Sequence, residues 1–142
     1  MARGEALRII ERLGLEPLEG EGGYFRFLSK FGDGTGSIYY LITEDSFSSL
    51  HLLDDDEIWF FLEGGEAEQI IFDGEKKERR VLSPSSRFSL VPGGFWQETK
   101  LVSGEYALFS TVMSPAYRDE IYHAPDSDVL KAFGESSVQN PV

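Results

Sequence analysis

The chain has 142 residues, of which 41% are hydrophobic and 13% aromatic. This length and composition suit one globular domain with a real core, and argue against a disordered segment or a disulfide-dependent miniprotein. The 25 acidic and 13 basic side chains give a formal net charge of -12, which repels nucleic-acid phosphates and anionic lipids, and the lack of cysteine excludes disulfides, thiolate metal sites and a cysteine nucleophile.

The N-terminal segment predicts a short amphipathic helix over residues 2–13. Apolar residues recur there at helical spacing, and Gly14 follows as a stop signal. The segment lacks the continuous apolar stretch of a signal peptide, and nowhere do about 18 apolar residues run together. We therefore expect a cytoplasmic protein with no nucleic-acid and no membrane partner.

From about residue 23 to 113 the sequence changes to nine short apolar or alternating runs, separated by turn sequences such as GDGTG, EGG and PGG. This spacing predicts an antiparallel barrel or sandwich. The basic cluster KKERR at 76–80 follows a DG turn and is interpreted as a solvated hairpin arm. After Pro115 we expect less regular structure, with a short helix over 126–134 that has an Asp or Ser cap and a terminal glycine. Residues 1–142 are expected to form a single domain.

Two short motifs resemble those of the cupin superfamily. Four residues fall on the positions of the first cupin motif, and one of them, Leu53, stands where its second histidine belongs. Three residues fall on the positions of the second motif, with Gln97 in place of its histidine. The outer positions of both motifs also depart from the pattern. The residues at the motif positions are His51, Leu53, Glu57, Gly64, Pro92, Gly94 and Gln97.

Three stretches resemble one branch of that superfamily more closely: GGYFR at 22–26, the segment 51–61, and VPGGFWQ at 91–97. Over about residues 9–123 the chain is similar to the uncharacterised cupin family called DUF985 or Cupin_5. The resemblance implies an all-β double-stranded β-helix, or jelly roll, which here has a short N-terminal helix and a less regular C-terminal tail. It also implies a homodimer with a ligand site at the barrel mouth, and it implies no particular reaction.

Strand parity predicts one pocket around the motif residues. Residues two apart on a strand share a face, so the residues that follow Glu57 and flank Gln97 at that spacing should point inward with them. The result is an aromatic chamber with an imidazole, a carboxylate and a carboxamide at its polar end, as in many small-molecule sites. Tyr24 and Arg26 of the GGYFR stretch are also assigned to the pocket, as is Tyr39. The guanidinium of Arg26 can clamp an anionic ligand, and the alternative is that it pairs with a surface carboxylate. The predicted ligand-binding residues are His51, Glu57, Gln97, Trp59, Phe61, Phe95, Tyr24, Arg26 and Tyr39.

The same motif positions decide whether a metal is expected. Catalytic iron and zinc sites take about three strong protein ligands. His51 and Glu57 supply two, and Gln97 offers a neutral carbonyl oxygen. We therefore expect no resident cofactor, and a weakly bound divalent metal would use these three residues. Otherwise His51 is a barrel histidine bonded to Glu57 or to backbone, and Asp54, Asp55 and Asp56 form a solvated turn.

Two classes of function stay open. The first is a metal-independent small-molecule binder that holds an apolar or sugar-like ligand in an aromatic-lined pocket. The second is an enzyme: a metal-independent sugar epimerase or isomerase, with His51 as base and Tyr24 or Tyr39 as acid, or a weakly metal-assisted lyase or oxygenase. A storage role is a third alternative.

The side chains that point away from Glu57 on its own strand indicate the oligomeric state. If Glu57 points inward, Ile58, Phe60 and Leu62 point outward, and three such positions without a polar side chain need a cover. The N-terminal helix, a further layer of sheet or a second chain could supply it. We expect a homodimer that buries this face, with Trp96 nearby on the same side.

Overall fold

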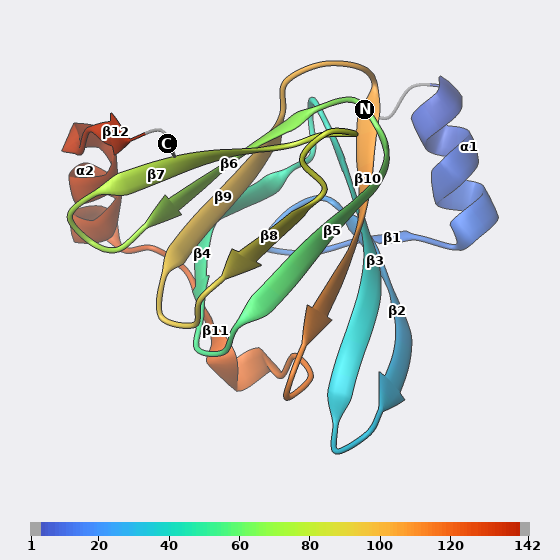
Figure 1. Ribbon diagram of the computed structural model, residues 1–142, viewed down its shortest axis with the longest axis horizontal. Coiled ribbons are helices and arrows are strands. Elements are labelled where there is room, and N and C mark those ends of the chain that lie inside the picture. Colours follow the sequence, from blue (N-terminus) through green and yellow to red (C-terminus); the bar gives the residue numbers. More distant parts are fainter. Residues whose placement is uncertain (1–3, 140–142) are drawn as a thin grey trace.

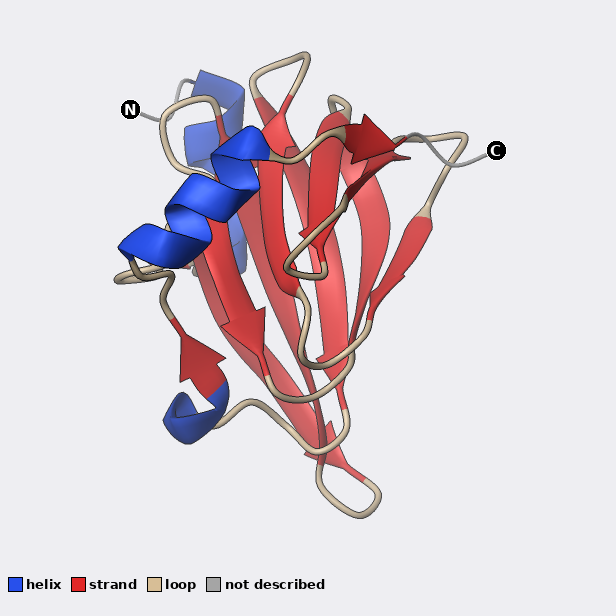
Figure 2. Ribbon diagram, turned by 90° about the vertical axis from the view of Figure 1, so that its left-hand side faces the viewer, coloured by secondary structure: helices blue, strands red, loops and turns tan. Residues whose placement is uncertain are grey.

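The computed structural model describes residues 4–139 of the chain. Two six-stranded sheets face each other, as Figure 1 and Figure 2 show. Sheet A has the strand order β1-β2-β3-β10-β5-β8, and sheet B has the order β11-β4-β9-β6-β7-β12. Sequential strands alternate between the two sheets from β3 to β6, which is the winding of a jelly roll. The all-β prediction is confirmed.

All nine predicted runs form strands. They are β2 (Tyr24–Phe31), β3 (Thr35–Thr43), β4 (Ser48–Leu53), β5 (Glu57–Gly64), β6 (Ala67–Phe72), β7 (Lys77–Leu82), β8 (Phe88–Val91), β9 (Trp96–Leu101) and β10 (Tyr106–Met113). Two-residue strands extend the sheet edges: β1 (Glu16–Pro17), β11 (Tyr122–His123) and β12 (Val138–Gln139). A 3-10 turn, η1 (Asp119–Ile121), precedes β11.

Helix α1 (Gly4–Leu13) covers part of the outer face of sheet A (Figure 1). Ala6 and Ile9 are buried on its inner side, in one cluster with Leu41 of β3 and Leu108 of β10. The predicted amphipathic helix is confirmed where the chain is described, and positions 2 and 3 of the prediction lie outside the described residues.

Helix α2 (Ser127–Glu135) lies against the outer face of sheet B, where the ring of Phe133 meets the edge of Phe72 at 5.5 Å. The predicted acidic cap is Asp126, whose side chain accepts a hydrogen bond from the Val129 amide at 2.8 Å. The predicted terminal glycine does not end the helix. Gly134 lies within it and Ser136 is the C-cap, because the amide of Ser136 still donates to Ala132.

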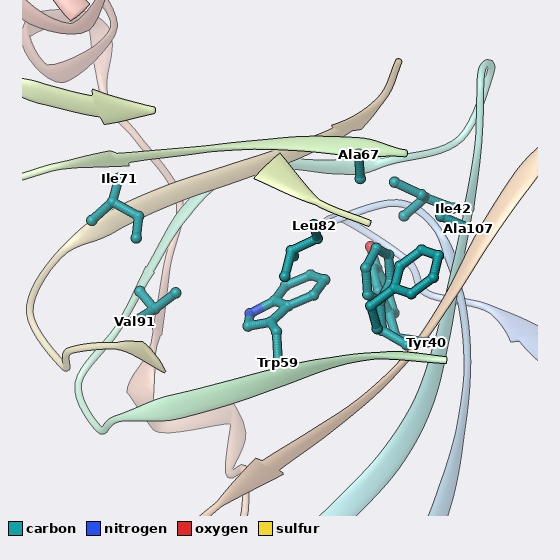
Figure 3. Packing of buried hydrophobic residues seen from close by; sticks show 10 residues of the cluster. Tyr40, Ile42, Trp59, Ala67, Ile71, Leu82, Val91 and Ala107 are labelled. Carbon is teal, nitrogen blue, oxygen red and sulfur yellow. The ribbon is translucent and has the colours of Figure 1, made fainter. Parts of the chain in front are cut away.

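The packed part of the interior lies between the two sheets. Trp59 of β5 is 1% exposed and meets Tyr40 and Phe109 edge-on, with ring centroids 5.5 and 5.2 Å apart. Figure 3 shows its indole next to Leu82, with Val91 on one side and Tyr40 on the other. The predicted inward parity of β5 and β9 is confirmed, since Phe61 and the β9 residues on the face of Gln97 are also buried or packed on this core.

The basic cluster at 76–80 forms the start of β7 in a hairpin with β6, as predicted. The turn is held by Asp73, whose carboxylate accepts hydrogen bonds from the amides of Glu75 and Lys76 at 2.7 and 2.8 Å. These backbone bonds lower the pKa of Asp73. Over residues 4–139 no helix is long and apolar enough to cross a membrane. The cytoplasmic location stays a prediction.

The outer face of β5 and β8 is apolar and stands free of α1. Phe60 and Leu62 are 40% and 39% exposed, and Phe88 and Leu90 of β8 are exposed beside them. The prediction that Trp96 lies on this same outer side is wrong. Trp96 belongs to β9 in sheet B, where its backbone neighbours are Leu52 and Phe72.

Candidate functional site

A cavity of about 380 Å³ lies between the sheets, at the end of the molecule that η1 and β11 occupy. Six aromatic residues line it: Phe25, Phe27, Tyr40, Trp59, Tyr117 and Tyr122. Four carboxylates do so as well: Glu19, Glu21, Glu57 and Asp119. Glu19 and Asp119 are exposed, whereas Glu57 is buried, so the carboxylates extend from the mouth to the interior.

Glu57 is the most deeply placed carboxylate of the cavity. It begins β5 with an inward side chain that is 7% exposed, and it accepts a hydrogen bond from the Gln97 amide nitrogen at 3.3 Å. Burial raises its pKa and the negative charge of Glu21 raises it further, against smaller opposing effects of Thr111, His51 and Gln97. Glu57 therefore holds a proton more readily than an exposed glutamate does.

The orientation of Gln97 follows from its two neighbours. The indole nitrogen of Trp59 donates to its Oε1 at 3.2 Å, and its Nε2 donates to Glu57. An indole nitrogen can only donate, so the amide oxygen must face Trp59 and the amide nitrogen must face the carboxylate. The side chain at the second motif position thus supports Glu57 and does not offer its oxygen to the cavity.

His51 lies behind the cavity wall. Its Nδ1 is 2.7 Å from the carbonyl oxygen of Ser49, which can only accept, so Nδ1 carries a proton. Its Nε2 is 3.5 Å from Oε1 of Glu21, and its ring stacks on Tyr122 with centroids 5.5 Å apart. Glu21 and Tyr122 line the cavity and His51, which is 1% exposed, holds both of them in place.

Glu21 comes from the loop between β1 and β2. Its Oε2 accepts from the hydroxyl of Ser48 at 2.8 Å, and its backbone carbonyl accepts from the amide and the hydroxyl of Ser49. The two glycines that follow allow this path of the backbone, because both have positive φ, 101° at Gly22 and 78° at Gly23. A Cβ at Gly23 would lie 2.3 Å from the Tyr40 hydroxyl oxygen, so only glycine fits that position.

Tyrosines complete the polar part of the wall. The hydroxyl of Tyr40 donates to the Gly22 carbonyl at 2.5 Å, and burial raises its pKa well above the usual value, with Glu21 adding to the effect. Burial and the neighbouring Asp119 raise the pKa of Tyr117 to about 12. Both phenols are therefore neutral hydrogen-bonding groups near neutral pH.

The three polar residues predicted from the motifs do lie together. His51 and Gln97 are register partners on β4 and β9, and Gln97 joins Glu57 by its amide. Of the aromatic residues assigned to the pocket, Trp59 lines the cavity, whereas Phe61 and Phe95 belong to the packed core. Parity placed these two on the correct face but not at the correct depth.

The placement of Tyr24, Arg26 and Tyr39 in the pocket is corrected by the structure. Tyr24 and Tyr39 pack with α1 on the outer face of sheet A, and Arg26 is exposed with its guanidinium donating to the Leu13 carbonyl at 3.0 Å. Their assignment rests on the GGYFR stretch and on the choice of candidate acids, not on strand parity, and they lie on the face of β2 and β3 opposite the cavity. Their neighbours line the cavity instead, Phe25 on β2 and Tyr40 on β3.

Several cavity residues were missed by the sequence reasoning. Glu21 lies in a loop with no strand pattern, and the acid before two glycines in EGEGGYFR was the available signal. Tyr117, Asp119 and Tyr122 come from the segment after Pro115, which has no periodicity to indicate that it closes one end of the sandwich.

The donor set does not fit the metal that cupin motifs usually hold. Leu53 replaces one ligand, and the oxygen of Gln97 is turned to Trp59. Among the residues that the structure describes, no group of three or more His, Asp or Glu side chains could hold a metal ion.

The aspartates at 54–56 form a turn whose carboxylates have partners in the protein. Asp54 pairs with His123 at 2.9 Å, and Asp55 pairs with Arg118 at 3.1 Å. Asp56 accepts a hydrogen bond from the Gly93 amide at 2.8 Å. These contacts agree with the predicted turn and give His123 a place at the surface.

Comparison with known proteins identifies the family. The family model Cupin_5, described as "Cupin superfamily (DUF985)", matches residues 7–123, so the chain belongs to this family. No curated protein gives a significant match.

Similar solved structures share the fold of this chain. A hypothetical protein from Leishmania major is 21% identical with a TM-score of 0.82, over 90% of this chain and 91% of its own. A protein of Shewanella oneidensis is 24% identical with a TM-score of 0.77, over 89% and 88%. A cupin 2 conserved barrel domain protein from Rhodopseudomonas palustris is 13% identical with a TM-score of 0.69, over 86% and 83%. Likeness at these identities shows the cupin fold.

Proposed function

We propose that this Cupin_5 protein binds a small organic molecule in the cavity between its sheets, without a metal. The observation that carries the proposal is a buried carboxylate, Glu57, in a cavity whose volume of about 380 Å³ falls in the range of ligand pockets, roughly 300–1,000 Å³. Mostly apolar walls with a few fixed polar groups are typical of such pockets. The ligand would lie among the aromatic rings and take its orientation from Glu57 and Glu21.

The geometry gives the enzymatic alternative less support. An epimerase needs a base and an acid on opposite sides of its substrate. His51 is separated from the cavity by Glu21 and Tyr122, and the proposed acids Tyr24 and Tyr39 lie on the outer face of sheet A. Binding requires none of these three residues to touch the ligand.

Native mass spectrometry of freshly purified protein tests the proposal. We expect a bound mass of a few hundred daltons that is released when the protein is denatured. Ile38→Trp places an indole in the cavity and should abolish the bound mass. Leu7→Trp adds the same ring on the exposed side of α1 and should retain it. A bound mass retained by Ile38→Trp, or absent from wild type under native conditions, would contradict the proposal.

For the partner we propose a second copy of the chain, docked on the exposed outer face of β5 and β8. Phe60 and Phe88, 40% and 67% exposed, lie opposite each other there and form an apolar patch of the kind that marks interfaces. Phe60→Asp should shift a wild-type dimer to monomer in sedimentation velocity. Leu7→Asp, an equivalent change on α1, should leave the dimer intact, and a monomeric wild type at tens of micromolar would refute the docking.

A further inference from the structure

The charges around the cavity have one sign. Its four carboxylates are accompanied by no lysine, arginine or histidine among the described lining residues. Arg118 stands between two lining residues in sequence, yet it does not line the cavity and pairs with Asp55 and Glu120 at 3.1 and 3.7 Å. The potential inside the cavity is therefore negative, and an anionic ligand such as a nucleotide sugar would be repelled.

Three hydrogen-bond donors at or behind the wall are engaged within the protein. The Tyr40 hydroxyl donates to Gly22, and the Trp59 indole donates to Gln97. The Ser48 hydroxyl donates to Glu21. Besides the hydroxyls of Thr111, Tyr117 and Tyr122, the oxygens of four carboxylates are left to meet a ligand, and a carboxylate can only accept when ionised. A complementary ligand must therefore bring donors or positive charge of its own.

The aromatic lining favours the same kind of ligand. The faces of Trp and Tyr rings attract ammonium groups, and the attraction is stronger where the site is shielded from water. Tyr40 and Trp59, both 1% exposed, stand edge-to-face at 5.5 Å beside the buried carboxylate. Phe25, Phe27 and Met113 provide apolar wall for the remainder of a ligand.

We propose that the cavity takes an organic cation, an amine or quaternary ammonium group joined to a small apolar body. The cationic group would lie near Glu57 and Glu21 against the rings of Tyr40 and Trp59, and the apolar body would lie toward Phe25 and Phe27. This inference rests on the proposed binding function and adds the chemical class of the ligand.

The test compares probes that differ in charge but hardly in shape. Choline is matched by the neutral 3,3-dimethylbutan-1-ol and by the anionic 3,3-dimethylbutanoate, and hexylamine is matched by hexan-1-ol. Titrations followed by protein NMR at millimolar probe concentrations should show at least one cation binding about tenfold more tightly than its neutral isostere, which corresponds to about 1.4 kcal/mol. The anion should bind most weakly.

Variants of the cavity carboxylates test whether their charges cause the preference for cationic probes. Glu21→Gln and Glu57→Gln should each weaken cation binding several-fold while leaving the neutral isosteres unchanged. Glu105→Gln removes an exposed carboxylate from the turn before β10, away from the cavity lining, and should change neither. Because Glu21→Gln alters a loop residue and Glu57→Gln a strand residue, misfolding of one variant leaves the other as the test.

The outcomes separate this inference from the proposed function. Neutral or anionic probes that bind as tightly as the cations, or no binding by either cation, would overturn the cation assignment while a bound mass in native spectra still supports a ligand cavity. Probes that bind Ile38→Trp as well as wild type would show that binding occurs outside the cavity, and would contradict both.

Discussion

The two ends of the interior are built from the same strands, but one end is packed with side chains and the other encloses a cavity. Toward β6 and the start of β10, Phe61 and Phe109 fill the space between the sheets together with the fully buried Ala67 and Ala107. Toward η1 and β11, the same strand β5 carries Glu57 into a cavity. Alternation along a strand decides which face a side chain occupies, whereas its position along the strand decides whether it meets a packed core or an open cavity.

The difference between the two ends comes from what closes them. At the packed end, aromatic rings meet edge-on, as Phe61 and Phe109 do at 6.0 Å. At the hollow end, the loop that carries Glu21 and the segment around Asp119 line the cavity together with strand residues. A wall built partly from loops leaves a volume that side chains do not fill.

The largest expected effect contrasts an aromatic residue from each end. Phe109 is 0% exposed and contacts two other rings, so Phe109→Ala should lower the free energy of unfolding by about 3–5 kcal/mol. Phe25 is partly exposed beside the cavity, so Phe25→Ala should cost about 1–2 kcal/mol. Urea denaturation measures both values. Equal losses would mean that the hollow end is packed as tightly as the core.

A second comparison uses two glycines of the loop that carries Glu21. Gly20 and Gly23 have φ of 85° and 78°, so alanine at either is strained by about 1–2 kcal/mol. A Cβ at Gly20 meets nothing within 4 Å, whereas at Gly23 it meets the Tyr40 hydroxyl. Gly23→Ala should therefore destabilise by about 1–3 kcal/mol more than Gly20→Ala. If thermal unfolding shows the two variants to be equal, the loop does not pack on Tyr40 as described.

The pH dependence of stability tests the burial of Glu57. Its folded-state pKa is raised above the usual 4.5 by burial and by Glu21. The folded state thus holds this proton more tightly, so the associated stability is present below pH 4.5 and is lost as the pH rises through the folded pKa. Glu57→Gln, which has no proton to lose, should gain stability relative to wild type over that rise.

The groups that face Glu57 set the control for this measurement. They are Glu21, His51, Thr111 and Gln97, and His51 opposes the shift when it is protonated. Glu105→Gln, in an exposed turn, should follow the wild-type curve at every pH. Denaturation curves in which Glu57→Gln and wild type stay parallel from pH 4.5 to 8 would show that Glu57 is solvated.

These comparisons also show what the sequence could predict. The turn sequences and alternating runs are local signals, and they were sufficient for the nine core strands and for the inward face of β5 and β9. The two motifs brought Glu57 and Gln97 together. Parity could not have placed Tyr24 and Tyr39, because in YFRFL and SIYYLIT apolar and aromatic residues stand on both faces. The buried outer face under α1 removes the alternation that would have fixed the register.

The remaining part of the site depends on contacts between distant segments. Glu21 reaches the cavity because Ser48 and Ser49, 27 and 28 residues further along the chain, hold its loop. Tyr122 does so because β11 pairs with β4 across Leu53. No local sequence pattern indicates such pairings between distant segments. The excess of carboxylates in the cavity, which suggests the ligand class, follows from where the fold places these segments.

The smallest expected effect compares the packing of the two ends most directly, because the same methyl group is removed at each. Ile71 on β6 is 4% exposed in the packed core, so Ile71→Val should cost about 0.5–1.5 kcal/mol, the usual loss for one buried methyl group. Ile38 on β3 lines the cavity, where the same deletion enlarges a space that already exists, so Ile38→Val should cost less than about 0.5 kcal/mol. Replicate urea denaturation resolves this difference. A bound ligand that contacts Ile38 would raise its cost toward that of Ile71, so repeating the pair with choline present adds a readout of cavity occupancy. If Ile38→Val is the costlier change without any ligand, the hollow end is filled by packing and the cavity does not exist in solution.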